Sequence, residues 1–303
     1  MRIGVIGLGA IGGVMAERLM TAGLAPSLAA GRHAGVWKKN KKFFSASETL
    51  PQDQYDLILL CTRTAETETA LTPAAPFLKP DGAVVCLQNG LPEDRAARIV
   101  GPGRVLGAVI GWSASQTAPG ETQVTGGGKF ILGGPSPRLN DAAAVLKVAF
   151  PVKLTDNLQG ARWSKLAMNC AMSTLGAISG LTLGELAKTS RTRTLALAVV
   201  REVVQQGTAT GIHFEPVAGI RPDWLAKAPA PLAHLAIWLA ARRRPNQRTG
   251  MIARLEQGRS AGIDDLNALI GAPLNRQLTA MVRQIETRVR AISPKNLAEI
   301  TWT

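Results

Sequence analysis

The chain begins Met1-Arg2-Ile3-Gly4-Val5-Ile6-Gly7-Leu8-Gly9-Ala10-Ile11-Gly12-Gly13, and this stretch decides the fold. Residues 1–6 read as a short buried strand, and residues 14–22 follow with a helical pattern. The three glycines between them have the spacing of a dinucleotide-binding turn. The first makes the tight turn, the second lets the backbone approach a pyrophosphate, and the third lets helix and strand pack closely.

The helix that follows this turn offers free N–H groups and a partial positive charge to phosphates. The sequence therefore predicts a cofactor-binding turn formed by Gly7, Leu8, Gly9, Ala10, Ile11 and Gly12. The alternative is a glycine-rich turn that serves packing alone.

Strand and helix patterns alternate along the first half of the chain. Further strands are predicted at 25–30, 56–61, 82–87 and 105–110, with helices at 65–77 and 94–100. Such alternation indicates a parallel sheet. Two short strands around Gly126-Gly127-Gly128 predict a hairpin at the sheet edge.

After residue 158 only helices are predicted, at 161–178, 194–211, 231–243, 249–258, 262–270 and 274–292. We therefore expect an α/β, doubly wound Rossmann-type domain over 1–157, followed by an all-α domain over 158–303. The second domain is expected to hold the substrate and to supply the contact of a possible homodimer.

The end of the second predicted strand selects the cofactor. An NAD site places an acidic residue there, on the ribose 2′-OH. This strand ends Ala29-Ala30-Gly31-Arg32-His33, without an acid, and Arg32 lies 20 residues after Gly12. A guanidinium suits a 2′-phosphate, and Arg63 is a second candidate partner, so NADPH is predicted. The alternative is that Arg32 begins a solvated basic loop, because lysines follow at 38, 39, 41 and 42.

The composition of the 303 residues excludes several protein classes. With 46% hydrophobic residues the chain is not disordered, and no apolar run reaches the roughly 18 residues of a membrane span.

The three cysteines lie in apolar stretches and lack the spacing of metal ligands: Cys61, Cys86 and Cys170. We therefore expect reduced, buried thiols and no metal site. Glu17 and Arg18 interrupt the N-terminal apolar run, which argues against a signal peptide. We expect a cytoplasmic protein without membrane attachment.

The net charge of +14 requires a separate explanation. Residues 158–303 hold 19 basic and 9 acidic side chains, against 16 and 12 in residues 1–157. The run Arg242-Arg243-Arg244 is the strongest basic cluster, but no nucleic-acid-binding motif accompanies it and aromatics are only 4%. The excess fits a phosphorylated cofactor and a small anionic substrate better than nucleic acid.

A candidate catalytic pair lies in Trp163-Ser164-Lys165-Leu166-Ala167-Met168-Asn169-Cys170. Reduction of a carbonyl needs a proton donor at the developing alkoxide. Lys165 and Asn169 are four residues apart, so both lie on one face of an otherwise apolar helix. Desolvation in a cleft would lower the pKa of the lysine into a useful range, whereas a lysine that extends into solvent would keep its ordinary value.

These features together resemble the ketopantoate reductase (2-dehydropantoate 2-reductase) family. The resemblance covers nearly the whole chain. It rests on the glycine turn, Arg32, Gln88-Asn89-Gly90, the Trp163–Cys170 motif, and the spacing from Arg248-Thr249-Gly250-Met251 through Gly258-Arg259 to Ile263-Asp264.

The resemblance implies an NADPH-dependent reductase of a 2-oxo acid. In that family the lysine matching Lys165 is the general acid, and the asparagine matching Asn169 binds substrate. The asparagine matching Asn89 lies near the nicotinamide and the substrate. An Asn-Gly turn is the alternative explanation for Asn89.

The chain departs from the family at four positions. Ser173 stands where a second asparagine is usual, and Thr174 where a proline is usual. Gly250 replaces the substrate-binding serine, and Gly262 replaces the active-site glutamate. Because a site built to hydrogen-bond a hydroxy acid discriminates through such groups, we expect a roomier, less polar pocket and a substrate other than ketopantoate. Asp264 or Asp265 could compensate, although a solvated acidic helix start is the favoured explanation for both.

Two alternatives remain open at this stage. One is a genuine ketopantoate reductase, which would act in pantothenate biosynthesis. The other is a non-catalytic NADP(H)-binding regulatory protein. The absence of the family's active-site glutamate at position 262 supports this alternative.

Overall fold

The computed structural model describes residues 1–39, 42–118 and 120–302. The chain divides into two compact units, Met1–Leu158 and Gln159–Thr303. Within the described ranges, no helix combines the length and the apolar character that crossing a bilayer requires.

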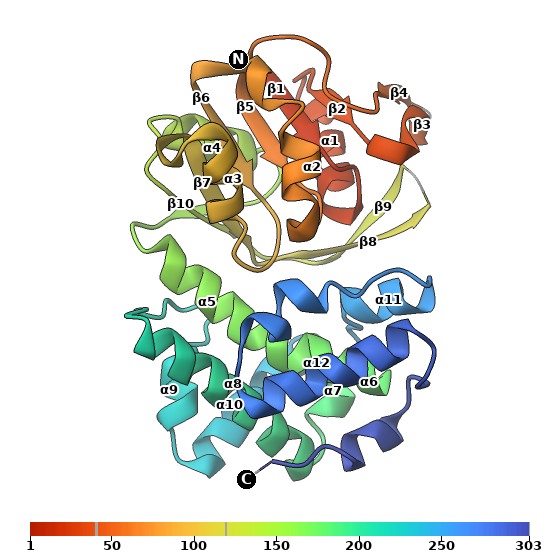
Figure 1. The fold of residues 1–303 in the computed structure, drawn as a ribbon, viewed down its shortest axis with the longest axis vertical. Coiled ribbons are helices and arrows are strands. Elements are labelled where there is room, and N and C mark those ends of the chain that lie inside the picture. Colours follow the sequence, from red (N-terminus) through yellow and green to blue (C-terminus); the bar gives the residue numbers. More distant parts are fainter. Residues whose placement is uncertain (40–41, 119, 303) are drawn as a thin grey trace. The chain divides into compact units, whose positions relative to one another are not determined.

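The first unit is built on a seven-stranded sheet in the order β11-β10-β7-β6-β5-β1-β2 (Figure 1). Its strands are β1 (Ile3–Ile6), β2 (Ser27–Ala29), β5 (Tyr55–Leu60), β6 (Leu78–Cys86), β7 (Val105–Ile110), β10 (Phe130–Gly133) and β11 (Val152–Leu154). Every neighbouring pair is parallel except β10 and β7, which are antiparallel. The strand order reverses between β1 and β5, and the carboxyl ends of these strands are where an open α/β sheet binds its ligand.

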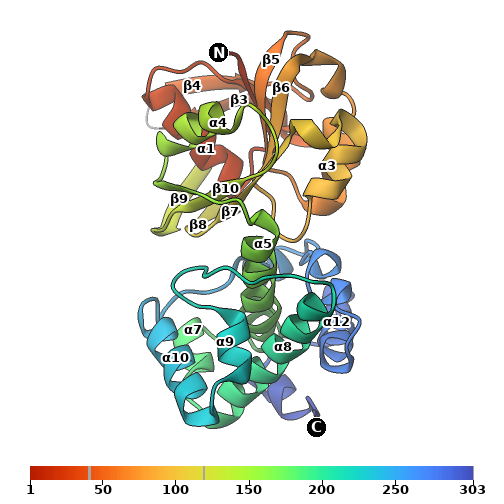
Figure 2. The ribbon, with the colours of Figure 1, turned by 90° about the vertical axis from the view of Figure 1, so that its left-hand side faces the viewer.

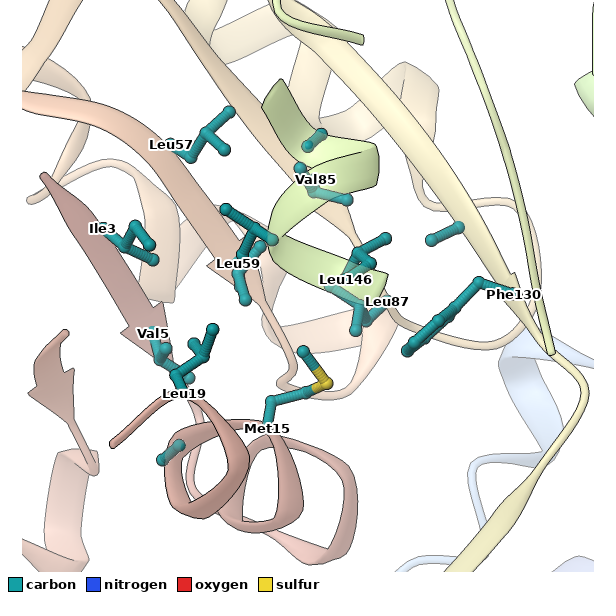
Figure 3. Packing of buried hydrophobic residues seen from close by; sticks show 14 of the residues in the cluster. Ile3, Val5, Met15, Leu19, Leu57, Leu59, Val85, Leu87, Phe130 and Leu146 are labelled. Carbon is teal, nitrogen blue, oxygen red and sulfur yellow. The ribbon is translucent and has the colours of Figure 1, made fainter. Parts of the chain in front are cut away.

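Both faces of this sheet are covered by helices. They are α1 (Ala10–Thr21), α2 (Thr67–Leu71), α3 (Glu93–Val100) and α4 (Leu139–Lys147). On one face, Val5, Leu57 and Leu59 form a buried cluster with Met15 and Leu19 of α1 (Figure 3). The alternate residues of the same strands point to the other face and pack against α2 and α3.

Two small ribbons and several single turns complete the first unit. The ribbons pair β3 (Gly35–Lys39) with β4 (Lys42–Ala46), and β8 (Ser113–Ala118) with β9 (Glu121–Gly126). The single turns are 3₁₀ turns at η1 (Gly31–His33), η2 (Thr64–Glu66), η3 (Ala75–Phe77) and η4 (Pro102–Arg104).

Apart from an isolated bridge between Val217 and Ile220, the regular elements in the described part of the second unit are helices. Its helices are α5 (Leu158–Met168), α6 (Thr174–Ser179), α7 (Leu183–Leu186), α8 (Ser190–Ala209), α9 (Pro222–Lys227), α10 (Ala230–Arg242), α11 (Gly250–Glu256) and α12 (Pro273–Glu286). Short 3₁₀ turns lie at η6 (Ile263–Asp265), η7 (Asn267–Leu269) and η8 (Pro294–Ala298).

One continuous helical run forms the centre of this unit. Helix α5 passes into a π-helical turn, Asn169–Ser173, and then into α6. We call Asn169–Ser173 the π turn. Helices α8, α11 and α12 pack around the π turn and α6. Figure 1 and Figure 2 show α5, α8 and α12 within this helical unit.

The predicted fold class is confirmed, since an α/β unit with a mixed, mainly parallel sheet precedes an all-α unit. Two local predictions were wrong. The helix predicted at 262–270 is two 3₁₀ turns. The predicted hairpin pairs β8 with β9, and the glycines at 126–128 instead connect β9 to β10. The alternative of a basic loop after Arg32 does not hold either, because the chain there forms the β3–β4 ribbon, with Lys41 outside the described residues.

Candidate active site

The glycine turn links β1 to α1 with the geometry that a phosphate site requires. Gly7 has a φ of 91°, which favours glycine, and its N–H donates to the Ala29 carbonyl at 2.8 Å. A Cβ on Gly12 would lie 1.9 Å from the Gly7 carbonyl oxygen, so only glycine fits there. A Cβ on Gly9 would meet no atom within 4 Å.

The first turn of α1 remains available for an anion. Gly9 is the N-cap residue and supplies no capping side chain, and the first turn contains no acidic residue. These residues fit a pyrophosphate, because there is open space beside Gly9 and helix N–H groups point toward it.

The carboxyl ends of β5 and β6 are held together by Gln88. This buried side chain donates to the Arg63 carbonyl at 3.0 Å and to Thr67 Oγ1 at 3.0 Å. The Thr64 hydroxyl donates to the Asn89 carbonyl at 2.6 Å. The sequence showed Gln88 only as part of a motif, and its role in joining the two strand ends was missed.

Asn89 is exposed at the end of this connection. Gly90 follows with a φ of 76°, and the chain bends at Asn89 and Gly90, in agreement with the role of an Asn-Gly pair in chain reversal. Asn89 is exposed, and among the described residues its side-chain amide has no hydrogen-bond partner. The bend and a ligand-binding role are therefore compatible.

The two arginines predicted for the 2′-phosphate differ in their surroundings. Arg32 lies in η1 directly after β2, is exposed, and has no ion pair with any residue in the described ranges. Arg63 instead pairs with Glu66, its Nε donating to Oε1 at 2.9 Å. This ion pair partly neutralises Arg63, so Arg32 is the stronger candidate for a phosphate.

Lys165 lies on α5, and its environment changes its acidity. The side chain is half-buried between residues of α5 that are fully buried. The pKa of Lys165 is lowered to about 8. Desolvation is the larger cause, and the positive charge of Arg244 is the smaller one. A cation with this pKa is a usable proton donor near neutral pH. The influence of Arg244, from the segment after α10, was not predicted.

The part-open face of the central run contains the predicted site residues. Lys165, Met168, Asn169, Met172 and Ser173 are half-buried, whereas all other residues from 160 to 179 are buried. Three of these five, Lys165, Asn169 and Ser173, were predicted from the sequence. Asn169, however, begins the π turn and is not part of a regular α-helix.

The two substitutions by glycine both leave open space. A Cβ at Gly250 or at Gly262 would meet no atom within 4 Å. Gly250 follows Thr249, whose hydroxyl donates to the Ser173 carbonyl at 3.3 Å, so α11 begins beside the π turn. Gly262 has a φ of 78°, a conformation that side-chain-bearing residues rarely adopt.

The acidic residues next to Gly262 face other partners. Asp264 forms an exposed ion pair with Arg283 at 2.5 Å. Asp265 is buried in the 3₁₀ turn. Within the described residues, no three His, Cys, Asp or Glu side chains are grouped in a way that could hold a metal.

Sequence comparison assigns both units to the same family. Residues 3–137 match the profile described as "Ketopantoate reductase PanE/ApbA", and residues 157–286 match "Ketopantoate reductase PanE/ApbA C terminal". The chain belongs to the ketopantoate reductase family. It is an oxidoreductase of the 2-dehydropantoate 2-reductase type, as its resemblance predicted.

Curated relatives of the family are similar over almost their full length. A 2-dehydropantoate 2-reductase of Pyrococcus horikoshii is 27% identical, with 95% of this chain and 98% of the relative covered. A 2-dehydropantoate 2-reductase of Caulobacter vibrioides is 28% identical, with 90% and 98% covered.

Solved structures support the fold. A PanE/ApbA family ketopantoate reductase from Ralstonia eutropha has a TM-score of 0.78 at 27% identity, with 95% of this chain and 99% of that chain covered. A D-mandelate dehydrogenase has a TM-score of 0.80 at 22% identity, with 95% and 99% covered. At that identity the second likeness shows the shared fold alone.

Proposed function

We propose that the chain is an NADPH-dependent reductase of a 2-oxo acid, or of a related C=O or C=N compound, with Lys165 as general acid. The observation that carries the proposal is the half-buried Lys165, whose pKa is lowered to about 8, on the part-open helix face that it shares with Asn169. These two properties support a role in proton transfer.

A nicotinamide cofactor is supported by the first unit. The turn from Gly7 to Gly12 fits a pyrophosphate, and the D-mandelate dehydrogenase structure is described as a complex with NADH. For this chain we propose NADPH, because the exposed Arg32 stands where an NAD site would carry an acid.

The cofactor supplies a hydride to the carbonyl carbon when it is bound. The Lys165 ammonium donates a proton to the carbonyl oxygen as negative charge develops there. Asn169, one turn further along the same run, orients the substrate by hydrogen bonding. In the first unit, the exposed amide of Asn89 is the proposed contact to the nicotinamide.

The substrate class follows from the departures at 250 and 262. The relatives named 2-dehydropantoate 2-reductase make ketopantoate the second candidate. Gly250 and Gly262 offer no polar side chain and leave open space, which favours a 2-oxo acid whose side chain lacks the hydroxyl group of ketopantoate and is bulkier.

A screen of NADPH oxidation tests this function. The 2-oxo acids would include ketopantoate, straight-chain and branched aliphatic acids, and aromatic acids, each repeated with NADH. We expect a higher kcat/KM with an acid other than ketopantoate. A superior kcat/KM with ketopantoate would remove the specificity argument, and no turnover with any acid would favour the non-catalytic regulatory alternative.

The pH dependence of reduction provides a direct check on Lys165. The proton donor is the charged form, so kcat/KM should be constant well below pH 8 and fall about tenfold per unit above the pKa of about 8. In the oxidation direction the neutral amine is the base, and the rate should rise through the same pH. A reduction profile that stays flat to pH 10 would contradict this role.

Arg244→Gln tests whether the pH profile reports the pKa of Lys165. Removing the like charge favours the Lys165 ammonium, so its pKa should rise and the fall in kcat/KM should move to higher pH. Arg243→Gln, at the exposed neighbouring position, is the control and should leave the profile in place.

Arg32→Gln tests the cofactor preference. Loss of a charged hydrogen bond to the 2′-phosphate should weaken NADPH binding by roughly ten- to a hundredfold, with NADH binding nearly unchanged. Cofactor fluorescence titration measures both constants. Arg98→Gln, at an exposed arginine on α3, is the control. Equal losses for the two cofactors would show that Arg32 does not recognise the phosphate.

A homodimer is proposed from the surface of α9 and α10. Leu232, Leu235, Leu239 and Trp224 are about half exposed, which is unusual for large apolar side chains. A solved family member from Staphylococcus aureus is described as a dimeric ketopantoate reductase. A solution mass of two chains by light scattering would support the dimer, and a mass of one chain would exclude it.

A further inference from the structure

The π turn changes which residues share a helix face. Two turns of an α-helix take about 7.2 residues, so in a regular helix Ser173 would be rotated by about 80° from Lys165. A π turn holds about one residue more than an α turn. Two turns of the observed run therefore take about eight residues, which brings Lys165, Asn169 and Ser173 into one row. This agrees with their shared half-burial.

The Cys170 carbonyl lacks the bond that a regular α-helix would give it from Thr174. The Thr174 N–H instead bonds to the carbonyls of Asn169 and Ala171. Cys170 is fully buried, so water is not available to its carbonyl. A buried carbonyl without a partner is costly, and a π turn at this place requires a donor from elsewhere.

Asn267 supplies that donor. Its Nδ2 donates to the Cys170 carbonyl at 3.0 Å, and its Oδ1 accepts from the Thr174 hydroxyl at 2.6 Å. Asn267 thus bonds to one residue inside the π turn and to the residue directly after it. Both Asn267 and Thr174 are fully buried.

A second layer holds Asn267 in place. Asn267 Nδ2 also donates to Asn275 Oδ1 at 2.8 Å, and Asn275 Nδ2 donates to Glu202 Oε2 at 2.8 Å. Glu202, on α8, further accepts the backbone N–H groups of Leu274 and Asn275 at 2.9 Å each. The amide groups of both asparagines are therefore tied to a carboxylate that also caps the start of α12.

We propose that Asn267 is a positioning residue, which holds the π turn in place and so keeps Asn169 and Ser173 in line with Lys165. The proposal rests on the proposed function for the catalytic meaning of that row. It assigns Asn267 no contact with substrate or cofactor.

Asn267→Ala is the first test. In its crystal structure we expect the Cys170 carbonyl to rejoin the α-helical ladder, with Ser173 rotated by about 80° from its present direction. With the best 2-oxo acid, kcat/KM should fall by about tenfold or more. NADPH affinity and the pKa seen in the pH profile should not change, because Lys165 precedes the π turn.

Asn296→Ala is the matched control. Asn296 is also a buried asparagine, and it donates to the carbonyls of Ile178 on α6 and of Ala291, at 2.9 Å each. It thus contacts the same helical run outside the π turn. We expect a comparable loss of melting temperature with kcat/KM within about twofold of the unaltered enzyme.

Thr174→Val keeps the test decisive if Asn267→Ala does not fold. The change preserves shape, removes the hydroxyl that donates to Asn267, and should lower kcat/KM several-fold. A retained π turn in Asn267→Ala, an unchanged kcat/KM in the folded variant, or an equal loss in Asn296→Ala would overturn the proposal. If the unaltered chain reduces no 2-oxo acid, the proposed function fails, while the crystal structure still decides whether Asn267 holds the π turn.

Discussion

Lys165→Ala should abolish turnover while NADPH still binds. The developing alkoxide would lose its proton donor, and general acid catalysis contributes about 10²- to 10⁴-fold. Lys165 lies in the second unit, outside the glycine turn that we propose for the cofactor, so the dissociation constant for NADPH should change little. Initial rates of NADPH oxidation and a fluorescence titration of NADPH measure the two quantities separately.

The control for this variant is Lys188→Ala. Lys188 is an exposed lysine of the same unit and should be dispensable for activity. Full activity of Lys165→Ala on the best substrate would refute the mechanism. A loss of NADPH binding together with turnover would instead indicate a change in the fold.

Gly12→Ala and Gly9→Ala should separate the two uses of glycine in the cofactor turn. A methyl group at Gly12 would meet the Gly7 carbonyl oxygen at 1.9 Å, and this backbone atom cannot move aside freely. Overpacking of this kind costs about 1–3 kcal/mol or more. We expect a clear fall in the free energy of unfolding of Gly12→Ala, measured by urea denaturation, together with weak cofactor binding.

Gly9→Ala is expected to affect cofactor binding but not stability. The added methyl group would meet no protein atom within 4 Å, and the backbone of Gly9, with φ −70°, accepts alanine. Stability should therefore be retained, while NADPH binds about tenfold or more weakly because the methyl group occupies the space of the pyrophosphate. Unchanged NADPH affinity in Gly9→Ala would show that the open space beside Gly9 is not the phosphate site.

The large features of the fold could be predicted because they depend on local patterns. The stretch 56–61 was predicted as a central strand, and β5 (Tyr55–Leu60) is that strand, with all of its residues buried. The turn from Gly7 to Gly12 could be interpreted because steric requirements at each glycine are specific. The β3–β4 ribbon was missed because its lysine-rich sequence resembles a solvated loop.

Only the site residues that lie within one sequence motif could be predicted. Lys165 and Asn169 were identified by their spacing, which in a regular helix implies one face. The π turn could not be predicted, because it depends on Asn267, nearly 100 residues further along the chain. The same is true of Arg244, whose charge acts on Lys165 only once the helices are packed.

The left-handed backbone at Gly262 limits which side chains this position accepts. A glutamate here, as the family resemblance implies, would have to adopt a φ of 78°, at a cost of about 1–2 kcal/mol. Engineering a carboxylate into the open space beside Gly262 would therefore lower stability even though no atom blocks the side chain. The backbone, and not the available room, sets the limit on redesign at this position.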